Sequence, residues 1–464
     1  MNPKEAHFED AIEESLLSAG GYRKSSPASF DRALGLDPVE LFAFIEVTQE
    51  TAWATLVQRH GGEAQARANF LRRLAKELDE RGTVDVLRHG VTDLGVTMRL
   101  AYFRPAHGLT PELVARYDAN RVTVTRQLAY EEGTSKALDL VLLVNGIPTA
   151  TAELKNRLTG QGIEHAKEQY RHDRDPANVT LARRAVVHFA VDPEAVAMTT
   201  RLDGPATRFI PFNQGSGGAG QAGGAGNPPN PEGHRTAYLW EQVWQRDSWL
   251  DILARFVHVV VPEKGSAAEK RKNTRVIFPR FHQLDAVRKL EADAKAIGAG
   301  KSYLVQHSAG SGKSNTIAWL AHRLSNLHDA LDRKVFDKVI VITDRLILDR
   351  QLQDTIYQFE HAHGVVVKID KDSKQLAEAL SGEQARIIIT TLQKFPFVLD
   401  KVKDLPDRKY AVFIDEAHSS QTGDAAIHMR AALAAKAAAA VGGDDARLLK
   451  AAESRNAYGG EGGD

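Results

Sequence analysis

Two acidic residues and a lysine lie at the ends of one short apolar stretch, L-D-L-V-L-L-V-N-G-I-P-T-A-T-A-E-L-K-N (138–156). Asp139 is near its start, and Glu153 and Lys155 are near its end. Because Glu153 and Lys155 are two residues apart, both side chains project from the same face of a strand. Two carboxylates can hold Mg²⁺, and the metal together with a lysine can activate water and offset charge on a phosphate. The three residues therefore predict a metal-dependent phosphodiesterase, with Asp139 and Glu153 as the metal ligands.

The turn inside this stretch decides whether the three side chains meet. Asn145 and Gly146 both tolerate positive φ and lie between residues that suit strands, which predicts a hairpin. A two-residue loop would send Asp139 and Glu153 to opposite faces, whereas a three-residue loop that ends at Ile147 would pair them. We predict the three-residue loop. The alternative interpretation is an ordinary hairpin whose charges face solvent, because so short a pattern is also common without any site.

A second group of residues has the composition of a phosphate-binding loop. Across residues 302–314, S-Y-L-V-Q-H-S-A-G-S-G-K-S, an apolar stretch leads into a glycine loop and then into a helical pattern. In such a loop, glycines let backbone N–H groups face phosphate, a lysine reaches the β- and γ-phosphates, and a serine binds Mg²⁺. His307 replaces the usual first glycine. The predicted nucleotide-binding residues are Gly310, Ser311, Gly312, Lys313 and Ser314, with Ser314 as a metal ligand.

An acidic pair further along the chain complements this loop. The apolar stretch Y-A-V-F-I (410–414) ends in Asp415 and Glu416, which Ala417 and His418 follow. Carboxylates at the end of a buried strand suit coordination of Mg²⁺ by Asp415 and activation of water by Glu416. Since both patterns occur within one strand–helix alternation, we predict that the chain binds ATP with Mg²⁺.

Helices followed by a mixed sheet are expected to position the hairpin. Apolar spacing and strand-forming residues indicate the elements: helices at 7–19, 38–59, 63–80 and 163–173, and strands at 96–103, 121–130 and 184–192. His188 lies inside the last of these strands, where we interpret it as a core histidine without a functional role. The segment at 214–230 is rich in Gly, Ala and Ser and predicts a flexible loop.

The periodicity changes after a polar run at 263–275, which we predict to be a linker. The domain that carries the hairpin is therefore expected at 1–262 and the ATP-binding domain at 276–464. In the second domain, strands are predicted at 302–307, 338–343, 386–391 and 409–414, with helices between them. This alternation predicts an α/β fold with a parallel, doubly wound sheet, whose ligands bind at the carboxyl ends of the strands.

Composition sets the limits on function. With 464 residues, 43% of them apolar, the chain is long enough for two or three domains. Lys+Arg and Asp+Glu both number 60, so any nucleic-acid surface must be local. Zero cysteines exclude disulfides and thiolate ligands. Because no membrane span or signal peptide is recognised, we expect a soluble, cytoplasmic protein.

The motifs and their order resemble a known family. Asp415 to His418 looks like motif II of superfamily 2 helicases and translocases, and Arg280-Phe281-His282-Gln283 resembles their adenine-reading motif, which implies that Gln283 contacts the base. The segments at 343–351 and 390–395 resemble those that contact DNA in that superfamily. Together with D-L-V-L-L-V-N-G-I-P and A-E-L-K-N, essentially the whole chain resembles the R (restriction) subunit of type I restriction enzymes.

This resemblance implies a PD-(D/E)xK restriction-endonuclease-like domain followed by a RecA-like P-loop domain. Its substrate would be double-stranded DNA, cleaved and translocated with ATP, and its partners the methylation and specificity subunits. Asp139, Glu153 and Lys155 would form the nuclease centre. Gln169 and Tyr170 resemble a downstream Gln/Tyr element that positions DNA, and Glu9 resembles an N-terminal helix glutamate near the metal.

A complete motor of this type has two RecA-like lobes, and the sequence predicts only the first, since no second-lobe pattern is recognised between His418 and Asp464. We therefore expect a truncated motor that binds ATP without effective hydrolysis or translocation. Two other functions stay open on sequence grounds. One is a stand-alone nuclease–helicase for DNA repair, and the other is an inactive DNA- or nucleotide-binding fragment.

Overall fold

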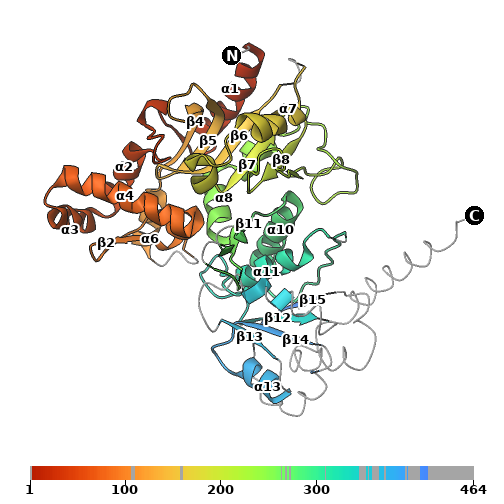
Figure 1. Cartoon of the computed structure of the whole chain (residues 1–464). Helices are drawn as coiled ribbons and strands as arrows, with labels where there is room; N and C mark the ends of the chain where they lie inside the picture. Colours follow the sequence, from red (N-terminus) through yellow and green to blue (C-terminus); the bar gives the residue numbers. More distant parts are fainter. Residues whose placement is uncertain are drawn as a thin grey trace, which may run out of the picture. The chain divides into compact units, whose positions relative to one another are not determined.

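The structure is a computed structural model, and its two compact units, Met1–Asp285 and Ala286–Asp464, are each described below (Figure 1). It describes residues 3–105, 110–156, 160–262, 264–266, 269–270, 273–308, 310–343, 352–353, 355–357, 365–369, 373–391, 394 and 408–415. The segment 263–275, expected to be a linker, falls inside the first unit. The reason is local pairing, because β11 (Arg275–Ile277) forms an antiparallel ladder with β10 (His258–Val260).

A seven-stranded mixed sheet forms the centre of the first unit, in the order β1-β4-β5-β6-β7-β8-β9. The β1/β4 and β6/β7 pairs are parallel, and the other neighbouring pairs are antiparallel. The strands are β1 (Arg23–Lys24), β4 (Val122–Ala129), β5 (Ala137–Val144), β6 (Ile147–Leu154), β7 (Val187–Val191), β8 (Val196–Thr199) and β9 (Ile210–Pro211). The predicted mixed α/β organisation is confirmed.

Helices α1 (Pro3–Ser18) and α7 (Ile163–Glu168) pack against strands β4, β6 and β7 of this sheet. Helix α1 buries Phe8, Ile12 and Leu16 and contacts β4 and β6. Between β6 and β7 the chain forms α7, which continues as a π-helical turn at Gln169–Asp173. A parallel pair of strands needs such a crossover connection.

A helical layer precedes β4 in the sequence. Its elements are α2 (Pro38–Thr48), α3 (Glu50–His60), α4 (Glu63–Arg81), α5 (Thr83–His89), the β2 (Val91–Asp93)/β3 (Val96–Met98) hairpin and α6 (Pro111–Asp118). The single helix predicted at 38–59 is two helices that meet at Gln49. The Gln49 side chain bonds both the backbone N–H and the carbonyl of Arg99, so it ties this break to the end of β3. The strand predicted at 96–103 ends at Met98.

Buried aromatic side chains pack around α8 (Arg246–Asp251) in the first unit. Two π-helical turns, Leu239–Val243 and Ile252–Phe256, flank α8. Trp249 lies fully buried, with its ring 5.9 Å from that of Phe278. The glycine-rich segment closes on itself through Gly215 N–H to Gly226 O at 2.8 Å.

The second unit contains a four-stranded sheet in the order β13-β14-β12-β15, and all its pairs are parallel, as predicted. Its strands are β12 (Lys338–Thr343), β13 (Val366–Lys368), β14 (Ile387–Thr391) and β15 (Tyr410–Ile414). The described helices are α10 (Phe281–Ile297), whose first turn belongs to the first unit, α11 (Lys313–Leu324) and α13 (Ser373–Ser381).

The strand predicted at 302–307 is wrong. These residues form no ladder, and the side chain of Leu304 is 79% exposed. An apolar run shows that a segment can enter a sheet, but the ladder also needs a neighbouring strand to supply N–H and C=O partners. Among the described residues the run at 302–307 forms no β-ladder, so its apolar composition alone did not decide its structure.

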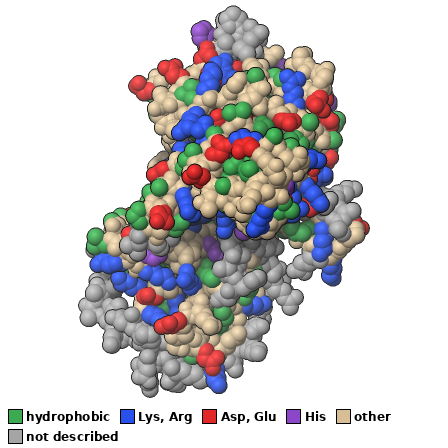
Figure 2. Space-filling view, turned by 90° about the vertical axis from the view of Figure 1, so that its left-hand side faces the viewer, with side chains coloured by type: hydrophobic (Ala, Val, Ile, Leu, Met, Phe, Trp, Pro, Cys, Tyr) green, Lys and Arg blue, Asp and Glu red, His purple; other side chains and the backbone are tan. Residues whose placement is uncertain are grey.

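Charges of both signs are interspersed on the face drawn in Figure 2, in keeping with the equal numbers of basic and acidic residues. No helix in the described part of the chain is long and apolar enough to cross a membrane.

Candidate functional site

A tight two-residue turn joins β5 to β6. Asn145 and Gly146 have φ values of 51° and 79°, and Val144 pairs directly with Ile147. The predicted three-residue loop is therefore wrong. The turn is held from outside, because Asn145 Oδ1 accepts from the N–H of Arg121 at 2.7 Å and a Cβ on Gly146 would lie 2.2 Å from the Asp37 carbonyl oxygen. Only glycine fits at that position.

A β-bulge then changes the register of the hairpin. The pairing shifts between Leu142 and Leu143, with Thr149 as the extra residue, so that Leu140 pairs with Ala152. The Thr149 hydroxyl donates to the Leu142 carbonyl at 3.1 Å and accepts from the indole N–H of Trp249 at 2.9 Å. A bulge of this kind puts two residues of one strand opposite one of the other. Extending the new register by one residue brings Asp139 opposite Glu153, the predicted pairing reached by a different route.

The three residues predicted for the nuclease centre lie together. Asp139 Oδ2 accepts from the backbone N–H of Leu154 at 2.8 Å and lies 3.8 Å from Lys155 Nζ. Asp139 is also close enough to Glu153 for its charge to raise the pKa of that carboxyl group. The side chains of Asp139 and Lys155 keep 13% and 12% of their surface exposed, so a solvent-borne substrate can reach them.

Glu153 is the most buried member of the group. Its side chain has no exposed surface, and Oε1 accepts from Arg174 Nε at 2.6 Å. Oε2 is buried and has no hydrogen-bond partner among the described residues. Burial, and secondarily the charge of Asp139, raise the pKa of Glu153 to about 8, although Arg174 and Lys155 oppose the shift.

Arg174 is a site residue that motif reasoning missed. Besides Glu153 it bonds the Ala137 carbonyl at 2.7 Å, so one guanidinium links β5 and β6 near Asp139. Tyr170 in the π-helical turn and Arg174 directly after that turn contact Thr151 and Glu153, which are two residues apart on β6.

The Gln/Tyr element lies on this same connection. Tyr170 is fully buried, and its hydroxyl bonds Thr151 Oγ1 at 2.8 Å, which in turn bonds His188 Nδ1 at 2.8 Å. Burial raises the pKa of Tyr170 well above its usual value and lowers that of His188 to about 3. His188 is therefore the neutral core histidine that was predicted. Gln169 is the half-buried first residue of the π-helical turn.

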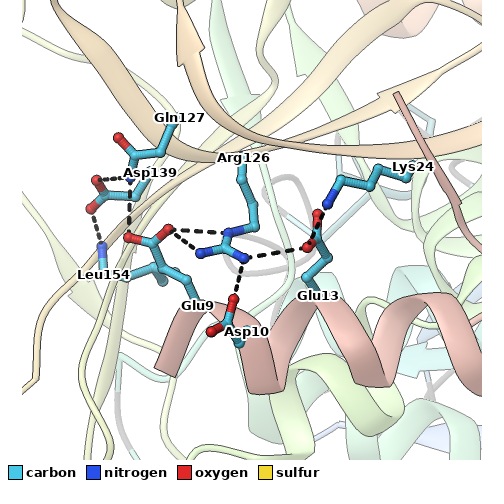
Figure 3. A network of polar contacts seen from close by, with 8 residues as sticks. All are labelled: Glu9, Asp10, Glu13, Lys24, Arg126, Gln127, Asp139 and Leu154. Atoms are coloured by element: carbon cyan, nitrogen blue, oxygen red, sulfur yellow. Dashed lines mark hydrogen bonds and ion pairs between the residues drawn. The ribbon is translucent and has the colours of Figure 1, made fainter. Parts of the chain in front are cut away.

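Acidic residues of α1 form the other side of the centre (Figure 3). Arg126 of β4 pairs with Glu9 at 3.0 Å, with Glu13 at 3.3 Å and with Asp10. Gln127 then bridges Glu9 and Asp139 through its side-chain amide. Burial and the charge of Asp139 raise the pKa of Glu9, which is only 3% exposed. The resemblance that placed Glu9 near the centre is thus matched by its position.

The donors in this centre suit a hard cation. Mg²⁺ prefers carboxylate oxygens, and Glu153 Oε2 is a buried acceptor without a hydrogen bond. Within the described residues no three His, Asp or Glu side chains already have the spacing of a complete metal site. The residues fit Mg²⁺ by their chemistry, and Asp139 and Glu153 are the pair that would hold it.

The second unit brings its predicted nucleotide residues together at one place. Gly310 and Gly312 have φ values of 70° and 87°, and α11 starts directly afterwards at Lys313, with Ser314 in its first turn. Lys313 Nζ lies 3.9 Å from Asp415 Oδ1, at the carboxyl end of β15. Left-handed glycines before a helix N-terminus aim backbone N–H groups outward, as a phosphate requires.

Gln283 and Glu416 were also predicted for the nucleotide site. Gln283 is 3% exposed, and its Oε1 accepts from the backbone N–H of Arg280 at 2.8 Å. Glu416 lies outside the described residues. In the second unit, therefore, the candidate nucleotide site is described by the glycine loop, the start of α11 and Asp415.

Comparisons with known proteins match both units. Residues 101–207 match the family model of the type I restriction enzyme R protein N terminus, and residues 282–459 match that of the SWI2/SNF2 ATPase. The first match spans the bulged hairpin and Arg174, and the second spans the glycine loop and Asp415.

Curated relatives agree with these matches. The type I restriction enzyme SsaAORF53P endonuclease subunit of Staphylococcus saprophyticus is 25% identical over 309 residues, which cover 66% of this chain and 30% of that protein. The SauCOLORF180P subunit of Staphylococcus aureus is 26% identical over 313 residues, with the same coverage. The HindI subunit of Haemophilus influenzae is 24% identical over 321 residues, which cover 66% of this chain and 28% of that protein.

The chain spans less than a third of the length of these relatives. The two family models match separate parts of the chain, with the R protein N terminus before the ATPase. The family-model matches and these relatives together show that about two thirds of this chain is similar to type I restriction enzyme endonuclease subunits.

Proposed function

We propose that the first unit is a PD-(D/E)xK endonuclease that cleaves double-stranded DNA with Mg²⁺, and that Asp139, Glu153 and Lys155 are its centre. The observation that carries the proposal is the bulge at Thr149, because it turns a hairpin that would separate the two acids into one that pairs them. The relatives are named endonuclease subunits, which supports the same reaction class.

Each residue has a physical task in this proposal. Mg²⁺ bound by Asp139 and Glu153 would supply positive charge to the scissile phosphate and lower the pKa of water. Lys155 holds a second positive charge beside Asp139, where it can offset charge that develops on the phosphate. Arg174 occupies Glu153 Oε1 and so leaves Oε2 for the metal.

The Gln/Tyr element has two separate tasks. Tyr170 acts from inside the protein, because its buried hydroxyl fixes Thr151 two residues before Glu153. Gln169, half-buried beside it, is the member that we propose to contact DNA.

For the second unit we propose a RecA-like lobe that binds ATP. Gly310, Ser311 and Gly312 would cradle the phosphates, and Lys313 would reach the β- and γ-phosphates. Gln283 would contact the adenine, and the residues for Mg²⁺ and water are Ser314, Asp415 and Glu416. The proximity of Lys313 and Asp415 supports this arrangement. In the whole protein, ATP would drive DNA translocation, and the chain would assemble with the methylation and specificity subunits.

Plasmid cleavage in Mg²⁺ tests the nuclease proposal. We expect Lys155→Ala and Asp139→Asn to lose at least about 100-fold of the cleavage rate, since each removes charge stabilisation from the transition state. The chain should be assayed alone and with methylation and specificity subunits added. Lys24→Ala is a matched control, because Lys24 is an exposed lysine that pairs with Glu13 on α1. Equal cleavage by the wild type and Lys155→Ala would remove the nuclease assignment.

A further inference from the structure

Gln127 has an unusual backbone conformation for a residue in the middle of a strand. Its φ is 48°, in the left-handed region, although its neighbours Arg126 and Leu128 pair normally with Leu140 and Leu138 of β5. The residue of β5 between those partners is Asp139, so the distortion lies directly opposite the proposed metal ligand. Non-glycine residues avoid the left-handed region, and they persist there when the surrounding structure imposes it, often at functional sites.

The Gln127 side chain uses this conformation to reach two carboxylates. Its Nε2 lies 3.1 Å from Glu9 Oε1 and 3.2 Å from Asp139 Oδ1. A side-chain amide carries two N–H donors, so one nitrogen can satisfy both acceptors at once. Figure 3 shows this bridge from β4 to helix α1 on one side and to β5 on the other.

The charge of the surroundings shows why an amide suits this position. Glu9 is 3% exposed, and its other oxygen is already neutralised by Arg126 at 3.0 Å. A lysine or arginine at 127 would add positive charge between the two acids and compete with a metal ion. A glutamate would add a third negative charge and could not donate. The neutral amide holds the carboxylates together without adding a charge of its own.

We propose that Gln127 is a positioning residue of the nuclease centre, whose side-chain amide holds Glu9 beside Asp139 so that both carboxylates face the same divalent cation. This inference rests on the proposed nuclease function. It assigns to Glu9 and Gln127 a joint task that neither residue can perform alone. The cation is recognised by its preference for carboxylate oxygens.

Calorimetric titration of the full chain with Ca²⁺ alone tests the proposal without depending on cleavage. Gln127→Gly removes the amide but suits positive φ, so the fold should be retained with a Tm within a few degrees of the wild type. We expect its Ca²⁺ affinity to fall at least about tenfold, because Glu9 is no longer held beside Asp139. Gln127→Asn also suits positive φ, but its amide is one methylene shorter and cannot bridge. Its affinity should fall as well.

Leu94→Gly is the matched control. Leu94 has a φ of 45° at the exposed β2–β3 turn, so glycine relieves the same kind of backbone strain away from the centre. Its Ca²⁺ affinity should equal that of the wild type. If both Gln127 variants keep wild-type affinity, or lose Tm without losing affinity, Gln127 is structural and the inference is overturned.

Asp139→Asn separates this inference from the function on which it rests. If Asp139→Asn loses Ca²⁺ binding while the Gln127 variants keep it, the metal centre stands and only the positioning task fails. If Asp139→Asn itself binds Ca²⁺ as the wild type does, both the metal centre and the inference are overturned.

Discussion

The two units hold their charged residues in opposite ways. In the first, Glu153 is fully buried and ion-paired with Arg174, whose side chain is 5% exposed. In the second, Lys313 and Asp415 keep 38% and 20% of their surface exposed and lie 3.9 Å apart. Charge pairs in water contribute little, whereas breaking a buried pair leaves an uncompensated charge. The proposed nuclease centre therefore helps to hold its unit together, whereas the pair in the proposed nucleotide site is partly exposed and contributes little to stability.

The sharpest test of this difference is Arg174→Ala. It leaves Glu153 Oε1 and the Ala137 carbonyl without their shared donor, so we expect a loss of about 1–3 kcal/mol in the free energy of unfolding for each acceptor. Chemical denaturation near neutral pH measures it. Arg333→Ala is the matched control, because Arg333 is 72% exposed and pairs with Asp329 at the protein surface. If the two arginine variants lose equal stability, the buried pair does not support the fold as described.

The pH dependence of unfolding gives a second test of the buried polar groups in the first unit, through His188. Its pKa is about 3 in the folded protein against 6.5 when unfolded, so only the unfolded chain gains the proton as pH falls below 6.5. Neutral His188 therefore contributes its full stability above pH 6.5, and this contribution is lost as the pH falls towards 3. At about pH 4 the free energy of unfolding is lower by on the order of 3 kcal/mol. Unfolding curves from pH 7 to pH 4 should show a smaller loss for His188→Gln. Identical slopes would mean that His188 is not buried as a neutral ring.

Thr149→Val should have a smaller effect. It removes a hydroxyl that serves two buried partners and leaves the Trp249 indole N–H without an acceptor. We expect a loss of about 1–3 kcal/mol, with reduced DNA cleavage if the bulge loosens. Thr55→Val, at an exposed hydroxyl on α3, is the control. An unchanged stability would show that the bulge is maintained by backbone pairing alone.

Lys313→Ala should change stability least, within about 1 kcal/mol of the wild type, because the pair with Asp415 is partly exposed. ATP affinity should nevertheless fall at least tenfold, since the lysine is the proposed partner of the β- and γ-phosphates. Thermal denaturation with and without ATP measures both effects. A large loss of stability without ATP would contradict the contrast between the two units.

Local chemistry made parts of this molecule predictable. Asn145 and Gly146 made the hairpin predictable because few residues tolerate positive φ. Gly310 and Gly312 made the phosphate loop predictable for the same reason. The alternation of apolar strand segments, now β12, β14 and β15, with helical segments was sufficient to predict a parallel sheet. These features depend on residues that lie next to one another in the chain.

Features that depend on distant partners escaped prediction. The bulge exists because Thr149 finds Trp249, one hundred residues away, as its hydrogen-bond donor. Arg174 and Gln127 belong to the centre because of tertiary placement, and neither belongs to the motif that indicated the site. The run at 302–307 had the right composition for a strand but has no pairing partner among the described residues.

The extra residue at Thr149 also has a consequence for comparing distant homologues. Strand side chains alternate between two faces, so the bulge reverses the parity of every position that follows it in β6. A single-residue alignment gap placed anywhere between Gly146 and Glu153 would exchange inward and outward positions, whereas a two-residue gap would preserve them. Relatives of this chain are about 25% identical to it, so gaps are easily misplaced in an alignment. In this hairpin, a gap of odd length would align the wrong residue with Glu153 of the proposed cleavage centre.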